Sequence, residues 1–489
     1  MKRTESGREK RGRLKTRLKL ASAFLALAHL AGFLTSIRAI MEVRTSQGAI
    51  AWAVSLNTFP VVALPAYWVL GRSKFSGYVT ARRAEFVKSE PLLKQLLDDL
   101  EQNGLESEEH RTQARLYEQL ARLPFTRGNQ ARLLVDGEAT FDAILAGIAS
   151  ARDYVLVQFY ILRDDDLGRR LQQALIAKAA EGVRCLVVYD EIGNQPGKAY
   201  CRALTEAGVT ILPFNTRQGE SNRFQLNFRN HRKIVVVDGE VAYVGGLNVG
   251  DEYLGLDPKM SPWRDTHVEV RGPVVQGVQL SFAEDWYWAA GEVLSGLNWT
   301  PRAVEGGEVV ALCLPSGPAD RLETATLYFL SAINHAQRRI WVASPYFVPD
   351  EQIVSALQLA ALRGVDVRIL IPKNPDNLMV GLSAYSYLEE LEAVGVRVFR
   401  YKPGFMHQKV MLVDDLAASV GTANFDNRSF RLNFEVSMIL VDPQFARTVE
   451  AMLEADFARS EPAYASELTD ASFPFRLAVK VSRLMAPLQ

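Results

Sequence analysis

The 489-residue sequence predicts a mixed α/β body made of two tandem repeats that pack with pseudo-two-fold symmetry, preceded by a two-helix transmembrane hairpin. The first supporting observation is a segment at 231–248 that recurs, with its polar residues in the same places, at 407–424. The second is the alternation of short β-branched runs with helical segments around both copies, which indicates βαβ units and a mainly parallel sheet. The third is a pair of long uncharged stretches near the N-terminus.

The composition restricts the class of protein. Hydrophobic residues make up 48% and charged residues 23% of the chain, which is typical of a globular protein. Three scattered cysteines are too few for a disulfide framework or a zinc site and fit buried thiols in a reducing compartment. The formal net charge is zero, but residues 1–71 carry eleven Lys and Arg against three Asp and Glu, so the body is net negative. A negative body argues against nucleic acid as the main partner.

The N-terminal region, residues 1–75, is predicted to anchor the chain in a membrane. Spans are expected at about 18–40 and 47–71, because each contains an uncharged stretch, of 18 and 27 residues respectively. A cleaved signal peptide is disfavoured because no small-x-small cleavage site follows the first stretch and a second apolar segment comes at once. Pro60 and Pro65 are expected to kink the second span, which membrane helices tolerate.

Positive charges flank both predicted spans. Nine basic residues lie within residues 1–19, before the first span, and several more follow the second. By the positive-inside rule, both ends of the hairpin and the body after it are expected on the cytoplasmic side. The basic residues that follow the second span are Arg72, Lys74, Arg82 and Arg83.

A helical connecting arm is expected at 76–130, where leucines recur at helical spacing. The first repeat is then predicted at 131–300 and the second at 305–489. Apolar runs at Tyr154–Ile161 and Ile340–Val348 occupy corresponding places in the two repeats, and each ends in an aromatic-rich strand. The leucines of the arm are Leu92, Leu93, Leu96, Leu97 and Leu100.

Each copy of the repeated segment places a histidine and a lysine two residues apart, next to an apolar β-branched run. Side chains at i and i+2 share a face of a strand, so His231 points with Lys233, and His407 with Lys409. An aspartate follows seven residues after each histidine, on the opposite face at the strand end. At that place, a role in hydrogen bonding within the fold is favoured over a direct role in the reaction. These aspartates are Asp238 and Asp414.

A glycine turn with an asparagine follows each aspartate, as Gly245-Gly246-x-Asn248 and as Gly421-Thr422-x-Asn424. Glycine at such a place lets the backbone approach a ligand closely, and an asparagine amide can donate to it. The expected phosphate-binding residues are Gly246, Asn248, Thr422 and Asn424.

An imidazole, an ammonium and an amide from each half suit the cleavage of a phosphodiester. The lysines and asparagines can neutralise the non-bridging oxygens without a metal, so neither a metal nor a cofactor is expected. One imidazole can attack phosphorus while the other protonates the leaving alkoxide and then deprotonates the acceptor. Carboxylates must fix the imidazole tautomers. The candidates are Asp265, 34 residues after His231, and Glu435, 28 residues after His407.

These motifs resemble the signature of the phospholipase D superfamily, H-x-K-x-x-x-x-D followed by G-[SG]-x-N, which occurs twice over roughly 131–440. Within that superfamily the chain is similar to the bacterial cardiolipin synthases, on segments such as FRNHRKIVVVDG, YVGGLNVGDEY, PWRDTHV and NFDNRSFRLNFE. The resemblance implies transfer of a phosphatidyl group from one phosphatidylglycerol to another, with release of glycerol, at the bacterial inner membrane. It also implies that the first-repeat histidine is the nucleophile. The residues that match the two signatures, implied to be catalytic, are His231, Lys233, Asp238, His407, Lys409 and Asp414.

The residues leave several alternatives open. The same site could serve a hydrolytic phospholipase D or a nuclease, and the acceptor could be phosphatidylglycerol, phosphatidylethanolamine or a small alcohol. A catalytically inactive membrane scaffold is disfavoured because both histidines and both lysines are intact. His267 could line the mouth of the site or simply pack. The sequence does not indicate an oligomeric state.

The C-terminal segment alternates apolar and basic residues and predicts a short helix at the interface of an anionic membrane. A terminal helix packed against the body is the alternative. The apolar residues are Phe475, Leu477, Ala478, Val481, Leu484 and Met485, and the basic ones are Arg476, Lys480 and Arg483.

Overall fold

The computed structural model describes residues 2–43, 45–71, 78, 93–107, 111–193, 196–214 and 227–489. The N-terminal helices belong to one compact unit. The described residues from Tyr78 onward, except Asn227, form a second unit, which is called the body. The basic residues expected after the second span (Arg72, Lys74, Arg82 and Arg83) and Leu92 of the arm lie outside the described residues.

The N-terminal unit consists of helices α1 (Lys2–Glu42), α2 (Ser46–Thr58) and α3 (Pro60–Leu70). The second predicted span is therefore two helices, with a break at Phe59. Phe59 has φ −129° and ψ 55°, because the helical region is disfavoured for a residue before proline and Pro60 lacks the N–H that would continue the helix. Pro65 lies inside α3 without ending it. Among the described helices, α1 alone is long and apolar enough to cross a membrane, over Arg13–Glu42.

Small residues let the three N-terminal helices approach closely. A Cβ atom at Gly32 would lie 2.2 Å from the carbonyl oxygen of Leu56, so only glycine fits where α1 meets α2. Ala39, Leu56, Ala63 and Tyr67 form a small buried cluster between the helices. The outer face of α1 leaves large apolar side chains such as Leu20 and Leu27 about two-thirds exposed, at 65% and 67%. Such a face is typical of a helix surrounded by lipid.

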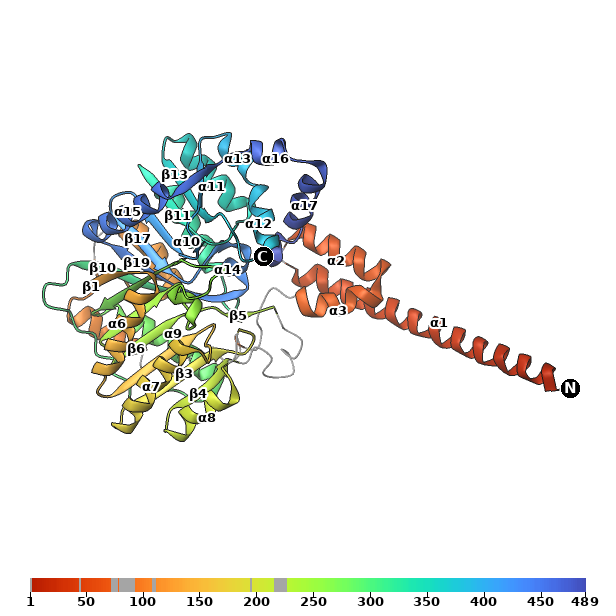
Figure 1. Cartoon of the computed structure of the whole chain (residues 1–489), viewed down its shortest axis with the longest axis horizontal. Helices are drawn as coiled ribbons and strands as arrows, with labels where there is room; N and C mark the ends of the chain where they lie inside the picture. Colours follow the sequence, from red (N-terminus) through yellow and green to blue (C-terminus); the bar gives the residue numbers. More distant parts are fainter. Residues whose placement is uncertain are drawn as a thin grey trace. The chain divides into compact units, whose positions relative to one another are not determined.

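The body is built on one extended sheet whose strand order is β20-β14-β13-β11-β16-β17-β19-β10-β1-β9-β7-β6-β2-β3-β4. The strands of the first half, orange to green in Figure 1, are β1 (Thr126–Val135), β2 (Tyr154–Phe159), β3 (Arg184–Asp190), β4 (Thr210–Phe214), β6 (Ile234–Val237), β7 (Val241–Gly245) and β9 (Thr266–Arg271). Those of the second half, teal to blue, are β10 (Val309–Ser316), β11 (Arg339–Ala343), β13 (Asp366–Pro372), β14 (Arg397–Tyr401), β16 (Val410–Val413), β17 (Ala417–Gly421), β19 (Asn433–Val441) and β20 (Ser460–Ala463).

The two halves have the same strand order when each is read outward from the antiparallel β1–β10 pair at the centre. The first half reads β1-β9-β7-β6-β2-β3-β4 and the second reads β10-β19-β17-β16-β11-β13-β14, with β20 added at the edge. The sheet is mixed, and the expectation of a mainly parallel sheet is wrong. Along this strand order the parallel pairs are those of the outer strands of each half, which follow helical crossovers, and beside it the short strand β5 (Arg229–Asn230) pairs in parallel with β19. The other pairs along this order are antiparallel, and two of them, β6–β7 and β16–β17, are hairpins. Residues 238–240 join β6 to β7, with Asp238 and Gly239 at positive φ (53° and 69°).

Helices fill the connections and complete two apolar cores, one in each half. The described part of the arm packs into the core of the second half, where Leu96 and Leu100 are buried. Strand β1 begins at Thr126, which lies inside the range predicted for the arm. The prediction missed the start of this strand because its polar residues alternate with few apolar ones. The helices of the body that have defined bounds are α5 (Arg111–Ala121), α6 (Asp136–Ser150), α7 (Asp166–Ala180), α8 (Lys198–Glu206), α9 (Val275–Ala290), α10 (Thr324–His335), α11 (Glu351–Leu362), α12 (Leu378–Tyr385), α13 (Leu388–Glu392), α14 (Asn427–Arg431), α15 (Pro443–Ala458), α16 (Ser466–Thr469) and α17 (Phe473–Arg483).

Candidate active site

The two histidines lie just before strands β6 and β16, and each is held in place by backbone of the other half. The N–H of His231 donates to the carbonyl of Phe434 at 2.9 Å, and the N–H of His407 donates to the carbonyl of Arg264 at 2.8 Å. Short parallel pairings accompany these bonds, between β5 (Arg229–Asn230) and β19 and between β15 (Phe405–Met406) and β8 (Trp263–Arg264). Each half therefore contributes a short strand that pairs with a strand of the other half, next to the predicted site residues.

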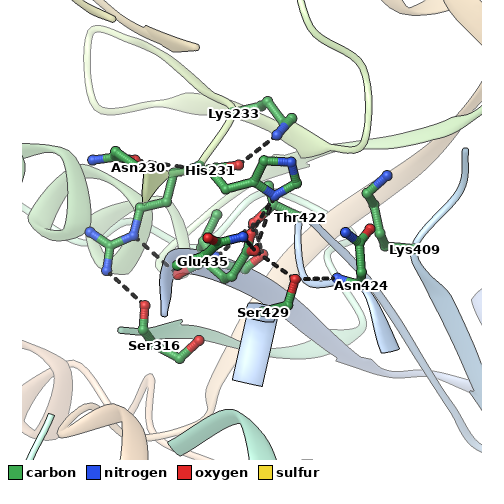
Figure 2. Close-up of polar contacts among 12 residues, drawn as sticks. Asn230, His231, Lys233, Ser316, Lys409, Thr422, Asn424, Ser429 and Glu435 are labelled. Atoms are coloured by element: carbon green, nitrogen blue, oxygen red, sulfur yellow. Dashed lines mark hydrogen bonds and ion pairs between the residues drawn. The ribbon is translucent and has the colours of Figure 1, made fainter. Parts of the chain in front are cut away.

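Each histidine also pairs with a carboxylate of the other half. Nδ1 of His231 lies 2.9 Å from Oε2 of Glu435, as Figure 2 shows, and Nδ1 of His407 lies 2.8 Å from Oδ2 of Asp265. Both carboxylates are fully buried. The sequence identified Asp265 and Glu435 as orienting residues by their distance from the histidine of their own half. The structure brings both of them into the site but exchanges the partners.

The two carboxylates are held differently. Glu435 accepts hydrogen bonds from the hydroxyls of Thr422 (2.6 Å) and Ser429 (2.9 Å) and from the amide of Asn433 (3.1 Å). Burial alone would raise the pKa of Glu435, but the neighbouring His231 and Lys233 and the bond from Thr422 lower it below its usual value. Glu435 is therefore kept ionised beside His231.

Asp265 instead lies against the backbone of the first glycine turn. A Cβ atom at Gly246 would lie 2.1 Å from its Oδ1, so a residue such as Thr422 cannot occupy this place in the first half. Its other partners are the N–H of Thr266 at 2.7 Å and, more distantly, the indole of Trp263 at 3.5 Å. Burial raises the pKa of Asp265 and the charge of Lys409 opposes the rise. The two His–carboxylate pairs are thus chemically unequal.

The two lysines are buried next to the histidines. Nζ of Lys233 donates to the carbonyl of His231 at 2.6 Å, and Nζ of Lys409 to that of His407 at 2.5 Å. Burial lowers the pKa of Lys233 well below its usual value and that of Lys409 to about 8. Burial likewise lowers the pKa of His231 to about 4, against the opposing charge of Glu435, and the pKa of His407 is lowered by burial and by both lysines. A bound phosphate anion would favour the charged form of all four groups.

The residues expected to bind phosphate have separate roles. Asn248 is used by the fold, since its Oδ1 accepts from the N–H of Ile161 (3.1 Å) and its Nδ2 donates to the hydroxyl of Tyr253 (3.0 Å). The Thr422 hydroxyl is used by Glu435. Asn424 is buried next to Lys409 in Figure 2, and its side-chain amide forms no hydrogen bond in the part of the chain that the structure describes, which leaves Nδ2 free to donate to a phosphate oxygen. Of the four, Asn424 therefore has the side chain best able to contact a ligand.

The two aspartates of the motifs lie at the far ends of β6 and β16, away from the imidazoles. The carboxylate of Asp238 accepts from the backbone N–H groups of Arg152, Asp153 and Tyr154 at 2.8–2.9 Å. That of Asp414 accepts from three equivalent N–H groups, of Gln337, Arg338 and Arg339, at 2.8–3.2 Å. These contacts support a structural role for both aspartates.

Replacement of Asp238 by alanine is expected to lower the melting temperature by a few degrees while leaving the geometry of the site intact. Three backbone donors lose their acceptor, at about 1 kcal/mol or more each where they are shielded from water, and alanine is less well tolerated than aspartate at φ 53°. Thermal unfolding followed by near-ultraviolet circular dichroism measures the change. Asp414→Ala should behave alike, and a variant that loses all activity at an unchanged melting temperature would contradict a structural role.

Aromatic residues that the sequence reasoning missed pack against both imidazoles. The ring of Tyr160 meets that of His231 edge-on at 5.2 Å, and Lys233 lies over the same tyrosine at 5.5 Å. Trp263 packs against His407 at 5.3 Å. The signal for Tyr160 was its place in the first of two corresponding aromatic-rich strand ends. His267, left open by the sequence, is buried with a pKa lowered by burial to about 3, and it packs rather than opening to solvent.

Comparison with known proteins identifies similar chains over almost the whole length. The family model described as cardiolipin synthase, PLD-like domain, matches residues 144–286 and 329–457. Proteins named cardiolipin synthase A from Pseudomonas putida and Pseudomonas fluorescens are 48% and 49% identical over 468 residues, which are 95% of this chain and 97% of each relative. Among solved structures, the phosphatidylserine synthase of Haemophilus influenzae has a TM-score of 0.57 at 16% identity, covering 77% of this chain and 100% of that chain.

Proposed function

This chain belongs to the family of cardiolipin synthases with a phospholipase D-like domain, and from that membership we propose how its residues carry out the reaction. It is a phosphatidyltransferase that makes cardiolipin. We infer that donor and acceptor are both phosphatidylglycerol, so that glycerol is the second product. The observation that carries the mechanism is the pair of buried histidines, each with a carboxylate of the opposite half and a lysine beside it.

His231 is the proposed nucleophile, because its partner Glu435 is the carboxylate whose pKa is lowered, by His231 and Lys233 and by the bond from Thr422. Nε2 of His231 forms a bond to phosphorus as the bond from phosphorus to the glycerol oxygen breaks. His407 gives that oxygen its proton, and glycerol leaves. A hydroxyl of the second phosphatidylglycerol then loses its proton to His407 and attacks phosphorus, and the bond to His231 breaks. Lys233, Lys409 and Asn424 face the charge on the non-bridging oxygens throughout.

We infer further that the body is a duplicated unit with a pseudo-two-fold axis through the β1–β10 pair. The matching strand orders support this, and so does the reciprocal exchange of backbone and carboxylate partners at the site. The axis would place the two histidines on opposite sides of one phosphorus, which in-line attack and departure require.

Full-length protein purified in detergent and supplied with phosphatidylglycerol tests the function directly. Equal amounts of cardiolipin and glycerol are expected by mass spectrometry, in the presence of a chelator as well as without it. Phosphatidic acid as the main product would favour a hydrolytic phospholipase D. Cardiolipin formed only when phosphatidylethanolamine is added would change the acceptor.

Thr422 is expected to act as a positioning residue for Glu435. Thr422→Val removes the 2.6 Å bond and one of the influences that lower the pKa of Glu435, so kcat should fall roughly tenfold, as expected for losing one hydrogen bond to a charged group. Activity is expected to be lost on acidification as Glu435 becomes protonated. In Thr422→Val this loss should occur at a higher pH than in the wild type. Thr422→Ser keeps the hydroxyl and should restore both values. An unshifted acidic limb in Thr422→Val would show that the hydroxyl only fills space.

The chain associates with membrane through its N-terminal apolar helix, and we propose a two-span anchor with both of its ends in the cytoplasm. A reporter fused after Gln489 is expected to be active in the cytoplasm, and one inserted near Glu42 is expected to be active outside. The reason is the excess of basic residues before the first span. Reporter activity in the cytoplasm at both places would refute the two-span hairpin.

A further inference from the structure

Helix α17 has one face packed on the body and one face in solvent. Val479 and Ser482 are buried, whereas Phe473, Leu477 and the residue that ends the helix, Leu484, are exposed at 73%, 51% and 77%. Large apolar side chains in such numbers on one short helix are unusual for a surface that faces only water.

The charges on α17 are all positive. From residue 471 to the C-terminus the chain has three basic residues and no acidic one. Arg483 is used by the fold, since it lies over the ring of Tyr387 at 4.7 Å and pairs with Glu390 at 3.3 Å. Arg476 and Lys480 are exposed, and neither forms an ion pair within the described part of the chain.

Helix α12 extends this surface, which was not predicted from the sequence. The two helices are joined by the hydroxyl of Ser482, which donates to the carbonyl of Met379 at 2.6 Å and lies 3.0 Å from the hydroxyl of Ser383. Figure 1 shows α12 and α17 side by side. Leu378 and Met379, at the start of α12, are exposed at 73% and 43%. The exposed apolar residues of α12 and α17, with Arg476 and Lys480, are called the α12–α17 surface below.

A cavity of about 200 Å³ opens beside the α12–α17 surface. Its walls are mainly apolar and include Phe347, Leu378, Leu382, Tyr385 and Phe475. Tyr385 and Phe475, one from each helix, meet edge-on at 5.4 Å.

The cavity adjoins the half of the candidate active site that holds Lys409. Tyr346 lies in sequence between two residues that line the cavity, and its hydroxyl donates to Oδ2 of Asp376 at 2.7 Å. Phe347, which lines the cavity, pairs in parallel with Phe425, and Phe425 directly follows Asn424 of the candidate site. A chain lying in the cavity would therefore end close to the groups proposed to bind phosphate.

We propose that the α12–α17 surface inserts into the headgroup region of a leaflet that contains anionic phospholipid, and that the cavity takes an acyl chain of the bound lipid. Apolar side chains interleaved with unpaired cations and no acids complement an anionic lipid surface. The acyl-chain part rests on the proposed function, whereas the insertion part does not.

Depth-dependent quenching on the full chain tests insertion without any need for turnover. The chain, with its three cysteines replaced, is placed in phosphatidylcholine bilayers with or without phosphatidylglycerol and carries a fluorophore at Leu484→Cys or Leu378→Cys. Spin-labelled lipid should quench both fluorophores, and more strongly when phosphatidylglycerol is present. A fluorophore at Leu362→Cys, an equally exposed leucine of α11 (68%), should stay unquenched. Equal quenching at all three positions, or none at Leu484 and Leu378, would overturn the proposal.

Two further variants separate the parts of the proposal. Arg476→Gln combined with Lys480→Gln should abolish the effect of phosphatidylglycerol on quenching at Leu484. Leu382→Trp, which narrows the cavity, should raise the KM for long-chain phosphatidylglycerol several-fold and leave that for a short-chain soluble analogue unchanged, with Leu362→Trp as the matched control. An equal rise for both lipids would overturn the acyl-chain part alone. Quenching as expected in a protein that makes no cardiolipin would refute the proposed function and leave the surface standing.

Discussion

Replacement of either His231 or His407 by alanine is expected to abolish turnover, with a loss of at least about 10³-fold in kcat. Each imidazole has a separate step in the proposed reaction, one forming the bond to phosphorus and the other moving the proton, so neither can substitute for the other. The carboxylates stay in place without them, because Glu435 keeps its bonds to Thr422 and Ser429 and Asp265 keeps its bond to the Thr266 N–H. Conversion of labelled phosphatidylglycerol to cardiolipin measures the loss.

The matched control is His335→Ala, an exposed histidine at the end of α10 whose side chain, among the described residues, bonds only to Ser331 of the same helix. It should keep full activity. The far-ultraviolet circular dichroism of both active-site variants should match the wild type, which separates lost chemistry from lost folding. More than a few per cent of wild-type activity in either variant would refute the two-histidine mechanism.

The membership of the candidate site could be predicted from the sequence because the chain contains the motif twice. A histidine two residues before a lysine is weak evidence once, but the same spacing at 231–248 and 407–424 ties both copies to one role. The pairing of histidines with carboxylates could not be predicted. Distance along the chain says nothing about which half packs against which, and the partners are set by the β5–β19 and β15–β8 contacts between halves.

The fold, like the site, could be predicted from the sequence only in part. Alternating strands and helices predicted an α/β body, but the direction of strand pairing depends on how the chain returns after each strand. Around the motifs it returns through two short hairpins, β6–β7 at Asp238 and Gly239 and its counterpart β16–β17, and the strand pairs there are antiparallel. Thr422 illustrates, for a single residue, the same limit of prediction from sequence. Its place in the motif suggested a phosphate contact, whereas only the folded chain shows Glu435 within 2.6 Å of it.

The identity of the histidine that carries the phosphatidyl group can be tested by stopping the reaction halfway. In His407→Asn, a phosphatidyl ester of nitrophenol should still react, because nitrophenolate leaves without protonation. The covalent form should then accumulate, since no base activates the acceptor. A burst of nitrophenolate equal to the enzyme present, followed by a stall, is the expected result. His231→Asn should give neither burst nor adduct with any substrate.

Locating the adduct decides between the two histidines. Digestion of the trapped His407→Asn protein under mildly alkaline conditions preserves phosphohistidine, and the mass shift is expected on the peptide that contains His231. The unequal carboxylates favour this outcome, because Glu435, whose pKa is lowered by His231 and Lys233 and by the bond from Thr422, stabilises the positive charge that forms on His231 when it bonds to phosphorus. A burst and adduct in His231→Asn, located on His407, would exchange the two roles. Asp265, with its raised pKa, would then be the carboxylate beside the nucleophile, and the ionised state of Glu435 would serve the proton transfer instead.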